Sequence, residues 1–217
     1  MILYKVWLNY SNSKEYRTIS KTNMHQLMNN KGVYGEYLTF NILKGFGGNI
    51  ITNLYLPKVK GGITEVDLVL INSKGIFVIE SKNYSGRIYG SIDSKNWMQI
   101  LGNNKRNRFY SPVLQNRTHI NSIKNILKDV NEKDIYSIIV FSERCNIDNV
   151  NVLSENVRVI KRNNLKSTIG DISNDNCIKF ADEEITNLYN KLLSYSNVSE
   201  IEKQQHIKNI REKYSSN

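Results

Sequence analysis

Cysteine and histidine are too scarce in this sequence to suggest a structural metal site. Among its 217 residues there are two cysteines, Cys145 and Cys177, and three histidines. The cysteines form no Cys-x-x-Cys pair and the histidines no His-Glu-x-x-His pattern, which are the spacings typical of zinc sites. We therefore expect two free, part-buried thiols and no zinc centre.

Long apolar runs are missing as well. The longest runs, such as residues 135 to 141, fall far short of the roughly 20 residues that span a bilayer. The first residues carry Lys5 and Asn9 within their apolar part, so we expect no secretory signal, no membrane association and a cytoplasmic location. A phosphate-binding Gly-x-x-x-x-Gly-Lys-Ser/Thr loop is also absent, so any ATP-driven step would need a partner ATPase or helicase.

Proline is rare too, and nothing resembles a flexible linker. With two prolines and no Gly/Ser-rich stretch, the sequence shows no sharp domain boundary. We expect an N-terminal extension over residues 1–30, a core over residues 31–160, and a C-terminal helical segment over residues 161–217 that packs on the core. Within residues 201–214, apolar side chains set among charges suggest a last amphipathic helix, which docks on the core or pairs two copies as a homodimer.

The apolar residues alternate between helical and strand spacing along the chain. Helices are expected over residues 34–45, 112–130 and 182–195. Strands are expected over residues 50–56, 65–71, 76–81, 88–90, 97–101, 135–141 and 156–160. This order indicates an α/β fold with one central mixed β-sheet flanked by helices.

Acidic residues are outnumbered, and one segment is almost without them. The chain has 30 Lys and Arg against 20 Asp and Glu. Between Lys82 and Lys128 there are nine basic residues and a single acid, Asp93. A basic segment of this kind favours a polyanionic partner, although many basic proteins simply carry surface lysines.

That basic segment follows an unusual strand, GIFVIESKNYSG, at residues 75–86. Side chains alternate along a strand, so Glu80 and Lys82 leave the backbone on the same side. If the preceding hairpin closes between Ile71 and Ile76, the two residue numbers of each opposed pair sum to 147. Asp67 then faces Glu80. A three-residue loop would set Asp67 against Ser81 instead.

Two neighbouring carboxylates repel each other and need a cation. Lys82 is one candidate, and Mg²⁺ is a better one, because it prefers oxygen ligands such as Asp67, Glu80 and the carbonyl of Ser81. Lys82 would then orient or deprotonate the attacking water. Such a centre beside a basic surface suits phosphodiester hydrolysis. The simpler alternative is a solvated salt bridge worth under about 1 kcal/mol.

These residues and their flanks resemble the NERD (nuclease-related) domain over residues 31–130, and more weakly over residues 131–160. The motifs that carry the resemblance are Gly35-Glu36, Glu65-Val66-Asp67, the stretch 75–86, Ile88-Tyr89-Gly90, Trp97, and Ser111-Pro112-Val113-Leu114-Gln115 with His119. The family often has Asn-Pro where this chain has Ser111-Pro112, and His where it has Leu68. These departures leave the metal site untouched but weaken any inference about substrate fit.

The NERD family is similar to the restriction-endonuclease-like superfamily, in which an Asp and a Glu-x-Lys bind Mg²⁺ and cut DNA. The resemblance therefore implies a restriction-endonuclease-like core that uses Mg²⁺ or Mn²⁺. It makes Asp67 and Glu80 metal ligands and Lys82 the catalytic lysine. It also implies that Glu36 touches the metal directly or through water, and that Gln115 contacts the substrate or orders a water.

Other side chains of the basic segment have two readings each. The basic residues that we expect to contact nucleic acid are Lys105, Arg106, Arg108, Arg87 and Arg117. The first three are expected in a polar loop, where they either touch phosphates or are simply solvated. The aromatic residues that either stack on unpaired bases or, more commonly, pack in the core are Tyr84, Tyr89, Trp97, Phe109 and Tyr110. His119 shares a helix face with Gln115, and we expect a buried, structural histidine there.

Three functions follow from this pattern. The leading hypothesis is a Mg²⁺-dependent deoxyribonuclease, an endonuclease with DNA as its partner. The second is a catalytically silent nucleic-acid-binding module of the same fold that scaffolds or recruits another factor. The third is RNA cleavage, which parallel assays on both polymers would separate from the first.

Overall fold

The computed structural model describes residues 11–152, 154–174 and 177–196. The amphipathic helix expected within residues 201–214 lies outside this range. The α-helices are α2 (Lys14–Ser20), α3 (Met24–Asn29), α4 (Lys31–Leu43), α5 (Pro112–Ile126), α6 (Leu165–Ser173) and α7 (Asp182–Leu193). The 3-10 turns are η1 (Lys44–Phe46), η2 (Glu132–Asp134), η3 (Arg162–Asn164) and η4 (Ser194–Ser196). No helix in the described ranges is long and apolar enough to cross a membrane.

Every strand expected from the sequence is present. The strands are β1 (Asn49–Pro57), β2 (Ile63–Asn72), β3 (Gly75–Lys82), β4 (Gly86–Ser91), β5 (Asn96–Ile100), β6 (Arg106–Tyr110), β7 (Ile135–Phe141), β8 (Cys145–Asn151) and β9 (Val157–Lys161). Strands β6 and β8, and helices α2, α3 and α6, are additions that the apolar spacing did not predict. In particular, Arg106 and Arg108 lie on β6 and not in the polar loop expected there.

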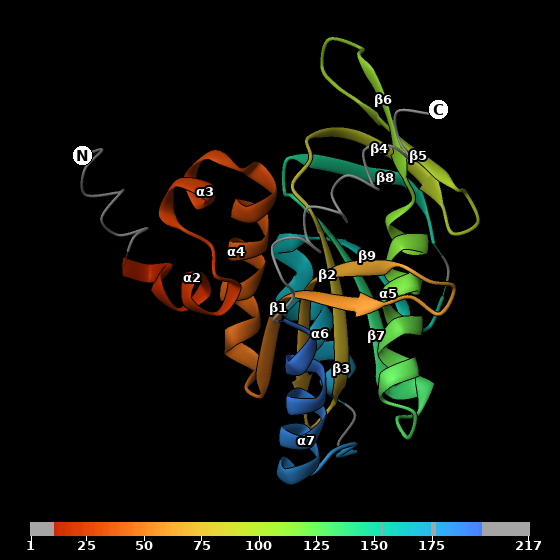
Figure 1. Cartoon of the computed structure of the whole chain (residues 1–217). Helices are drawn as coiled ribbons and strands as arrows, with labels where there is room; N and C mark the ends of the chain where they lie inside the picture. Colours follow the sequence, from red (N-terminus) through yellow and green to blue (C-terminus); the bar gives the residue numbers. More distant parts are fainter. Residues whose placement is uncertain (1–10, 153, 175–176, 197–217) are drawn as a thin grey trace.

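The first sheet has the strand order β1-β2-β3-β7-β9 and is mixed (Figure 1). Strands β1, β2 and β3 pair antiparallel, whereas β3, β7 and β9 pair parallel. One face is buried under α5 and α7, and the other under α2, α3, α4 and α6. Strand β3 is buried on both faces, which explains its continuous apolar run. The expected α/β class and the flanked mixed sheet are thus confirmed.

A second sheet corrects the prediction of a single one. Its strand order is β6-β5-β4-β8, and β4 begins at Gly86, just after β3 ends at Lys82 (Figure 1). Strand β8 was missed because it is a polar edge strand whose backbone pairing with β4 outweighs its weak propensity. The sheet covers a small core that contains Trp97 and buries Cys145, whereas Cys177 is exposed and not part-buried as expected.

Trp97 belongs to this second core and is 1% exposed, so it is not available to stack on a base. Its indole N–H donates to the carbonyl of Ser91 at 3.1 Å. The ring packs directly over Gly90, where an added Cβ would lie 2.2 Å from a ring atom. The Gly90 and Trp97 positions of the sequence pattern are therefore a packing pair.

The β2–β3 hairpin has the register that places acids together. Opposed residues run from Asn72 with Gly75 to Leu68 with Ile79, so their numbers add up to 147 as predicted. The next position on β2 is Asp67, and the next on β3 is Glu80. The alternative register with a three-residue loop is therefore excluded.

The regular alternation of faces breaks at Asp67. Val66 packs on the α5 side of the sheet and Leu68 on the α4 side. Residues two positions apart on a strand normally point to the same face. The facing residue on β1 is Asn53, whose φ of 52° is in the left-handed region. Such irregularities re-aim side chains and are common near active sites.

Candidate active site at the end of β3

Asp67 is tied to the end of β3 by a hydrogen bond. The backbone N–H of Ser81 donates to Oδ2 of Asp67 at 2.8 Å. The side chain of Asp67 therefore takes a strand N–H just beyond the last backbone pair of the hairpin, Leu68 with Ile79. This contact holds the carboxylate beside the Glu-x-Lys segment.

Glu80 and Lys82 form a close ion pair. Nζ of Lys82 lies 2.5 Å from Oε1 of Glu80, and the two side chains are 18% and 1% exposed. The other oxygen of Glu80, Oε2, is buried and has no hydrogen-bond partner within the described part of the chain. Nδ1 of His119 lies 3.6 Å from that oxygen.

Helix α5 brings Gln115 to the same point. Nζ of Lys82 also donates to Oε1 of Gln115 at 3.2 Å. The helix is anchored under β3 by the next residue, Asn116, whose amide donates to the Val78 carbonyl at 2.9 Å and to Oγ of Ser137 at 2.8 Å. Ser111 caps the start of the helix, and Pro112 occupies its first turn.

Glu36 reaches the site from α4, and its partner comes from residues assigned to the N-terminal extension. The hydroxyl of Tyr16, on α2, donates to Oε2 of Glu36 at 3.1 Å. Tyr16 was not predicted as a site residue, because its role depends on how α2 packs against α4.

The position of α4 is fixed by contacts around Gly35. The buried guanidinium of Arg162 donates to the Gly35 carbonyl at 3.3 Å and pairs with Glu143. The amide of Asn83 donates to the Lys31 carbonyl at 2.5 Å, and the side chain of Asn83 lies against Gly35. These contacts hold α4, and Glu36 with it, against the residues that follow β3.

The carboxylates of the site repel one another in a buried setting. Burial, and after it the negative charge of Glu65, raise the pKa of Glu36 to about 7. Burial, followed by the charges of Glu80 and Glu36, raises the pKa of Asp67 well above its usual range. Burial also raises the pKa of Glu80, although Lys82 partly offsets that effect. Ionising all three carboxylates at once is therefore unfavourable with Lys82 as their cation, and a further cation beside them would lower their pKa values.

Lys82 is held as an ammonium ion. Burial by itself lowers the pKa of Lys82, but the carboxylates of Glu80 and Asp67 outweigh it and raise that pKa above its ordinary value. Among the two roles expected for Lys82, orienting a water therefore fits this arrangement better than taking a proton from it.

His119 is fully buried, as expected of a structural histidine. It nevertheless faces Glu80 from α5. The helical spacing from Gln115 was the signal that could have placed it at the site.

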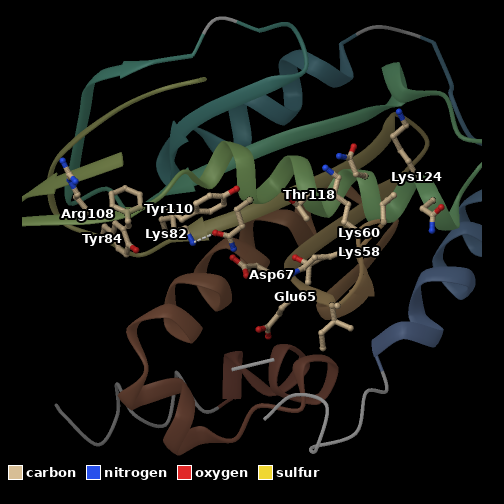
Figure 2. A pocket seen from close by; sticks show the side chains of 18 residues that line it. Lys58, Lys60, Glu65, Asp67, Lys82, Tyr84, Arg108, Tyr110, Thr118 and Lys124 are labelled. Carbon is tan, nitrogen blue, oxygen red and sulfur yellow. Dashed lines mark hydrogen bonds between the residues drawn. The ribbon is translucent and has the colours of Figure 1, made fainter. Parts of the chain in front are cut away.

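Asp67 and Lys82 lie in a groove of about 1310 Å³. Figure 2 shows Arg108 and Tyr84 on one side of Lys82, Tyr110 beside it, and Lys58, Lys60 and Lys124 on the other side. Phe109 also lines the groove, so part of the aromatic set faces it.

The predicted nucleic-acid contacts are only partly brought together. Arg108 lines the groove. The predicted contacts that are exposed but are not among the described groove residues are Lys105, Arg106, Arg87 and Arg117. Lys58, Lys60 and Lys124 line the groove instead, and the sequence analysis assigned them no role.

The donor set suits a hard divalent ion better than zinc. No group of three or more His, Cys, Asp or Glu side chains within residues 11–152, 154–174 and 177–196 converges on one metal position. Mg²⁺, however, is commonly held by one or two carboxylates and otherwise by water. The adjacent Asp67 and Glu80, with the orphaned buried Oε2 of Glu80, fit that requirement.

The fold and site thus define an α/β protein in which an Asp and a Glu-x-Lys meet at the floor of a groove. The sequence model of the nuclease-related domain (NERD) matches residues 31–142, just over half of the chain, and the chain belongs to this family. It is also 27% identical over 188 residues to an uncharacterized protein of Bacillus anthracis, covering 85% of this chain and 86% of that protein. No solved structure matches the chain significantly.

Proposed function

We propose that this protein is a Mg²⁺- or Mn²⁺-dependent nuclease that hydrolyses DNA phosphodiester bonds, acting as an endonuclease. The observation that carries the proposal is that Asp67 and Lys82 line one groove while Glu80, buried beneath it, pairs with Lys82. Membership of the nuclease-related family supports the same class of reaction.

Each side chain has a role in this proposal. Asp67 and Glu80 hold the ion, which supplies Lewis-acid polarisation of the phosphate and lowers the pKa of a water. The ammonium of Lys82 orients the attacking water and offsets the charge that develops on the phosphate oxygens. Gln115 fixes the position of that ammonium through its hydrogen bond. Glu36 adds negative charge from α4 and acts on the ion directly or through water.

We also assign the core to the restriction-endonuclease-like type. Two features support the assignment: a helix that carries one acid, α4 with Glu36, precedes the sheet, and the Asp and Glu-x-Lys lie on neighbouring antiparallel strands, β2 and β3. The parallel pairing of β3 with β7 follows after α5, which packs on the same strands.

A catalytically silent DNA-binding module is the second candidate. It is favoured by the bond from Lys82 to Oε1 of Glu80, which satisfies one ligand oxygen without any ion. In that case the basic groove binds DNA, and the ion pair is structural.

Cleavage assays separate the two candidates. Supercoiled DNA, linear DNA, single-stranded DNA and RNA are incubated with wild type, Asp67→Asn or Glu80→Gln in Mg²⁺, Mn²⁺ or EDTA. The nuclease proposal expects metal-dependent cutting of DNA by the wild type and by a control, Glu183→Gln, which changes an exposed acid on α7. Equal cutting by both site variants would contradict it, and preferred cutting of RNA would shift the substrate class.

A homodimer and a partner ATPase or helicase stay proposals. A dimer would allow both strands of a duplex to be cut, and light scattering measures the mass that decides it. A partner would be needed if the purified protein cuts only substrates that are already unwound.

A further inference from the structure

The groove continues past the catalytic residues along one face of α5. The lining residues of this helix are Gln115, Thr118, Asn121, Lys124 and Asn125. Their spacing of three or four residues places them in one row along the helix. The row begins at Gln115, which contacts Lys82, and leads away from the site towards Lys124.

The opposite wall is the turn between β1 and β2. Residues 58–62 form a tight turn, in which the Lys58 N–H donates to the Gly62 carbonyl at 2.8 Å and the Gly61 N–H donates to the Lys58 carbonyl at 3.0 Å. Gly61 and Gly62 have φ values of 87° and 76°, a conformation that side chains rarely adopt. The turn therefore has a defined shape and presents Lys58 and Lys60 to the groove (Figure 2).

The chemistry of this part of the groove differs from that of the other end. We call it the lysine arm and define it by Lys58 and Lys60 on the turn and Lys124 on α5, with Thr118 and Asn121 on the α5 wall. Of the aromatic residues that line the groove, Tyr84 lies on the other side of Lys82 and Tyr110 lies beside Lys82 (Figure 2). Ammonium, hydroxyl and amide groups suit phosphate oxygens, whereas aromatic faces suit bases.

Lys124 has an existing partner that a phosphate can replace. It pairs with Glu132, whose side chain is 70% exposed. Exposed ion pairs of this kind are worth under about 1 kcal/mol, so exchange for a DNA phosphate costs little. Glu65, the acid nearest the turn, accepts a hydrogen bond from the Tyr55 hydroxyl at 2.7 Å. Its charge acts on Glu36, so it belongs with the acids at the groove floor.

We propose that the lysine arm binds the sugar-phosphate backbone of the DNA strand to one side of the phosphate that is cut. This inference rests on the proposed function, because it takes Asp67 and Lys82 as the place of the scissile phosphate. Lys124 follows Gln115 by nine positions, about 14 Å along a helix. That length equals the rise of about four nucleotides of one strand in B-form DNA.

Binding in EDTA tests the proposal without any cleavage. The affinity of a fluorescent 20-base-pair duplex is measured by anisotropy over a range of salt concentrations for wild type and for Lys58→Ala/Lys60→Ala. The matched control is Lys166→Ala/Lys191→Ala, which removes two exposed lysines on α6 and α7. Each lost phosphate contact lowers the slope of log affinity against log salt by about 0.9.

In Lys58→Ala/Lys60→Ala, the turn variant, we expect the slope to fall by about 1 to 2. In the control the slope should stay unchanged. Lys124→Ala, on the opposite wall, is expected to lower the slope by about 1 even if the turn variant folds poorly. Equal slopes for the control, the turn variant and Lys124→Ala would overturn the inference. So would tighter lysine-dependent binding of an RNA duplex than of the DNA duplex.

Duplex length gives a second readout, and the two proposals can fail separately. Duplexes trimmed from either end are expected to lose the lysine-dependent affinity once fewer than about four nucleotides remain beyond the site. If the wild type cleaves DNA but the lysine variants have unchanged slopes, the lysine-arm proposal alone is refuted. A lysine-dependent slope without cleavage in any metal would refute the proposed hydrolysis alone. Absence of DNA affinity would refute both proposals.

Discussion

Nζ of Lys82 lies 2.5 Å from Oε1 of Glu80, on the last residues of a strand that is buried on both faces. The pair therefore has both a structural and a chemical role. Lys82→Met leaves the buried charge of Glu80 without its partner and is expected to lower the free energy of unfolding by roughly 1–3 kcal/mol. Cleavage is expected to fall about 100- to 1,000-fold, because a charge that stabilises the transition state is lost.

The double variant Glu80→Gln/Lys82→Met separates these two roles. It removes both charges, so part of the lost stability is expected to return in urea unfolding while cleavage stays at or below the level of Lys82→Met. Recovery of cleavage together with stability would show that the pair has a structural role only.

Stability in EDTA is expected to fall as the pH rises from 5 to 8. The folded-state pKa of Glu36 is about 7, above its unfolded value of 4.5. An acid with a raised pKa contributes stability that is fully present below pH 4.5 and is lost as the pH rises through about 7. Asp67, whose pKa is also raised, acts in the same direction.

Thermal unfolding of Glu36→Gln measures this contribution. The wild type is expected to lose several degrees of Tm across the range, and Glu36→Gln to lose clearly less. Glu183→Gln, on the exposed face of α7, should behave like the wild type. A Tm that falls equally in Glu36→Gln and in the wild type would contradict the assigned shift.

Divalent ions are expected to stabilise the protein most at high pH. Binding to the folded state alone raises Tm in proportion to the logarithm of ion concentration. Protons compete for the same carboxylates, so Mg²⁺ or Mn²⁺ should raise Tm more at pH 8 than at pH 5. In Asp67→Asn the increase should vanish at both values, and an undiminished increase there would place the ion elsewhere.

The fit of α4 against the loop after β3 offers a test that changes no charged side chain of the site. A Cβ added at Gly35 would lie 2.7 Å from Cβ of Asn83, whereas one at Gly45 would meet no atom within 4 Å. Gly35→Ala is therefore expected to destabilise the protein by about 1–3 kcal/mol and to reduce cleavage by displacing Glu36. Gly45→Ala serves as the control, and a neutral Gly35→Ala would show that α4 can shift without effect.

The sequence predicts the centre of this structure better than its edges. The strand pair that carries Asp67 and Glu80 is apolar on both faces, so only one register keeps its polar ends together, and that register is observed. The start of helix α5 was predicted equally well, because its apolar spacing begins at a proline.

The parts that could not be predicted depend on distant contacts. Strand β6 reads as a polar loop and becomes a strand only through its pairing with β5. The position of Lys58 and Lys60 opposite α5 follows from the packing of β1 and α5 on the same sheet, which local patterns do not encode. Tyr16 joins Glu36 across twenty residues for the same reason.

Nicking of supercoiled plasmid DNA by wild type and by Lys82→Ala, in Mg²⁺, Mn²⁺ and EDTA, tests the central claim most directly. Both proteins are purified in parallel with Lys166→Ala, which removes an exposed lysine outside the groove. The account predicts metal-dependent nicking by wild type and Lys166→Ala that disappears in Lys82→Ala and in EDTA. Nicking of the same rate in Lys82→Ala, or binding without nicking by the wild type in either metal, would contradict it.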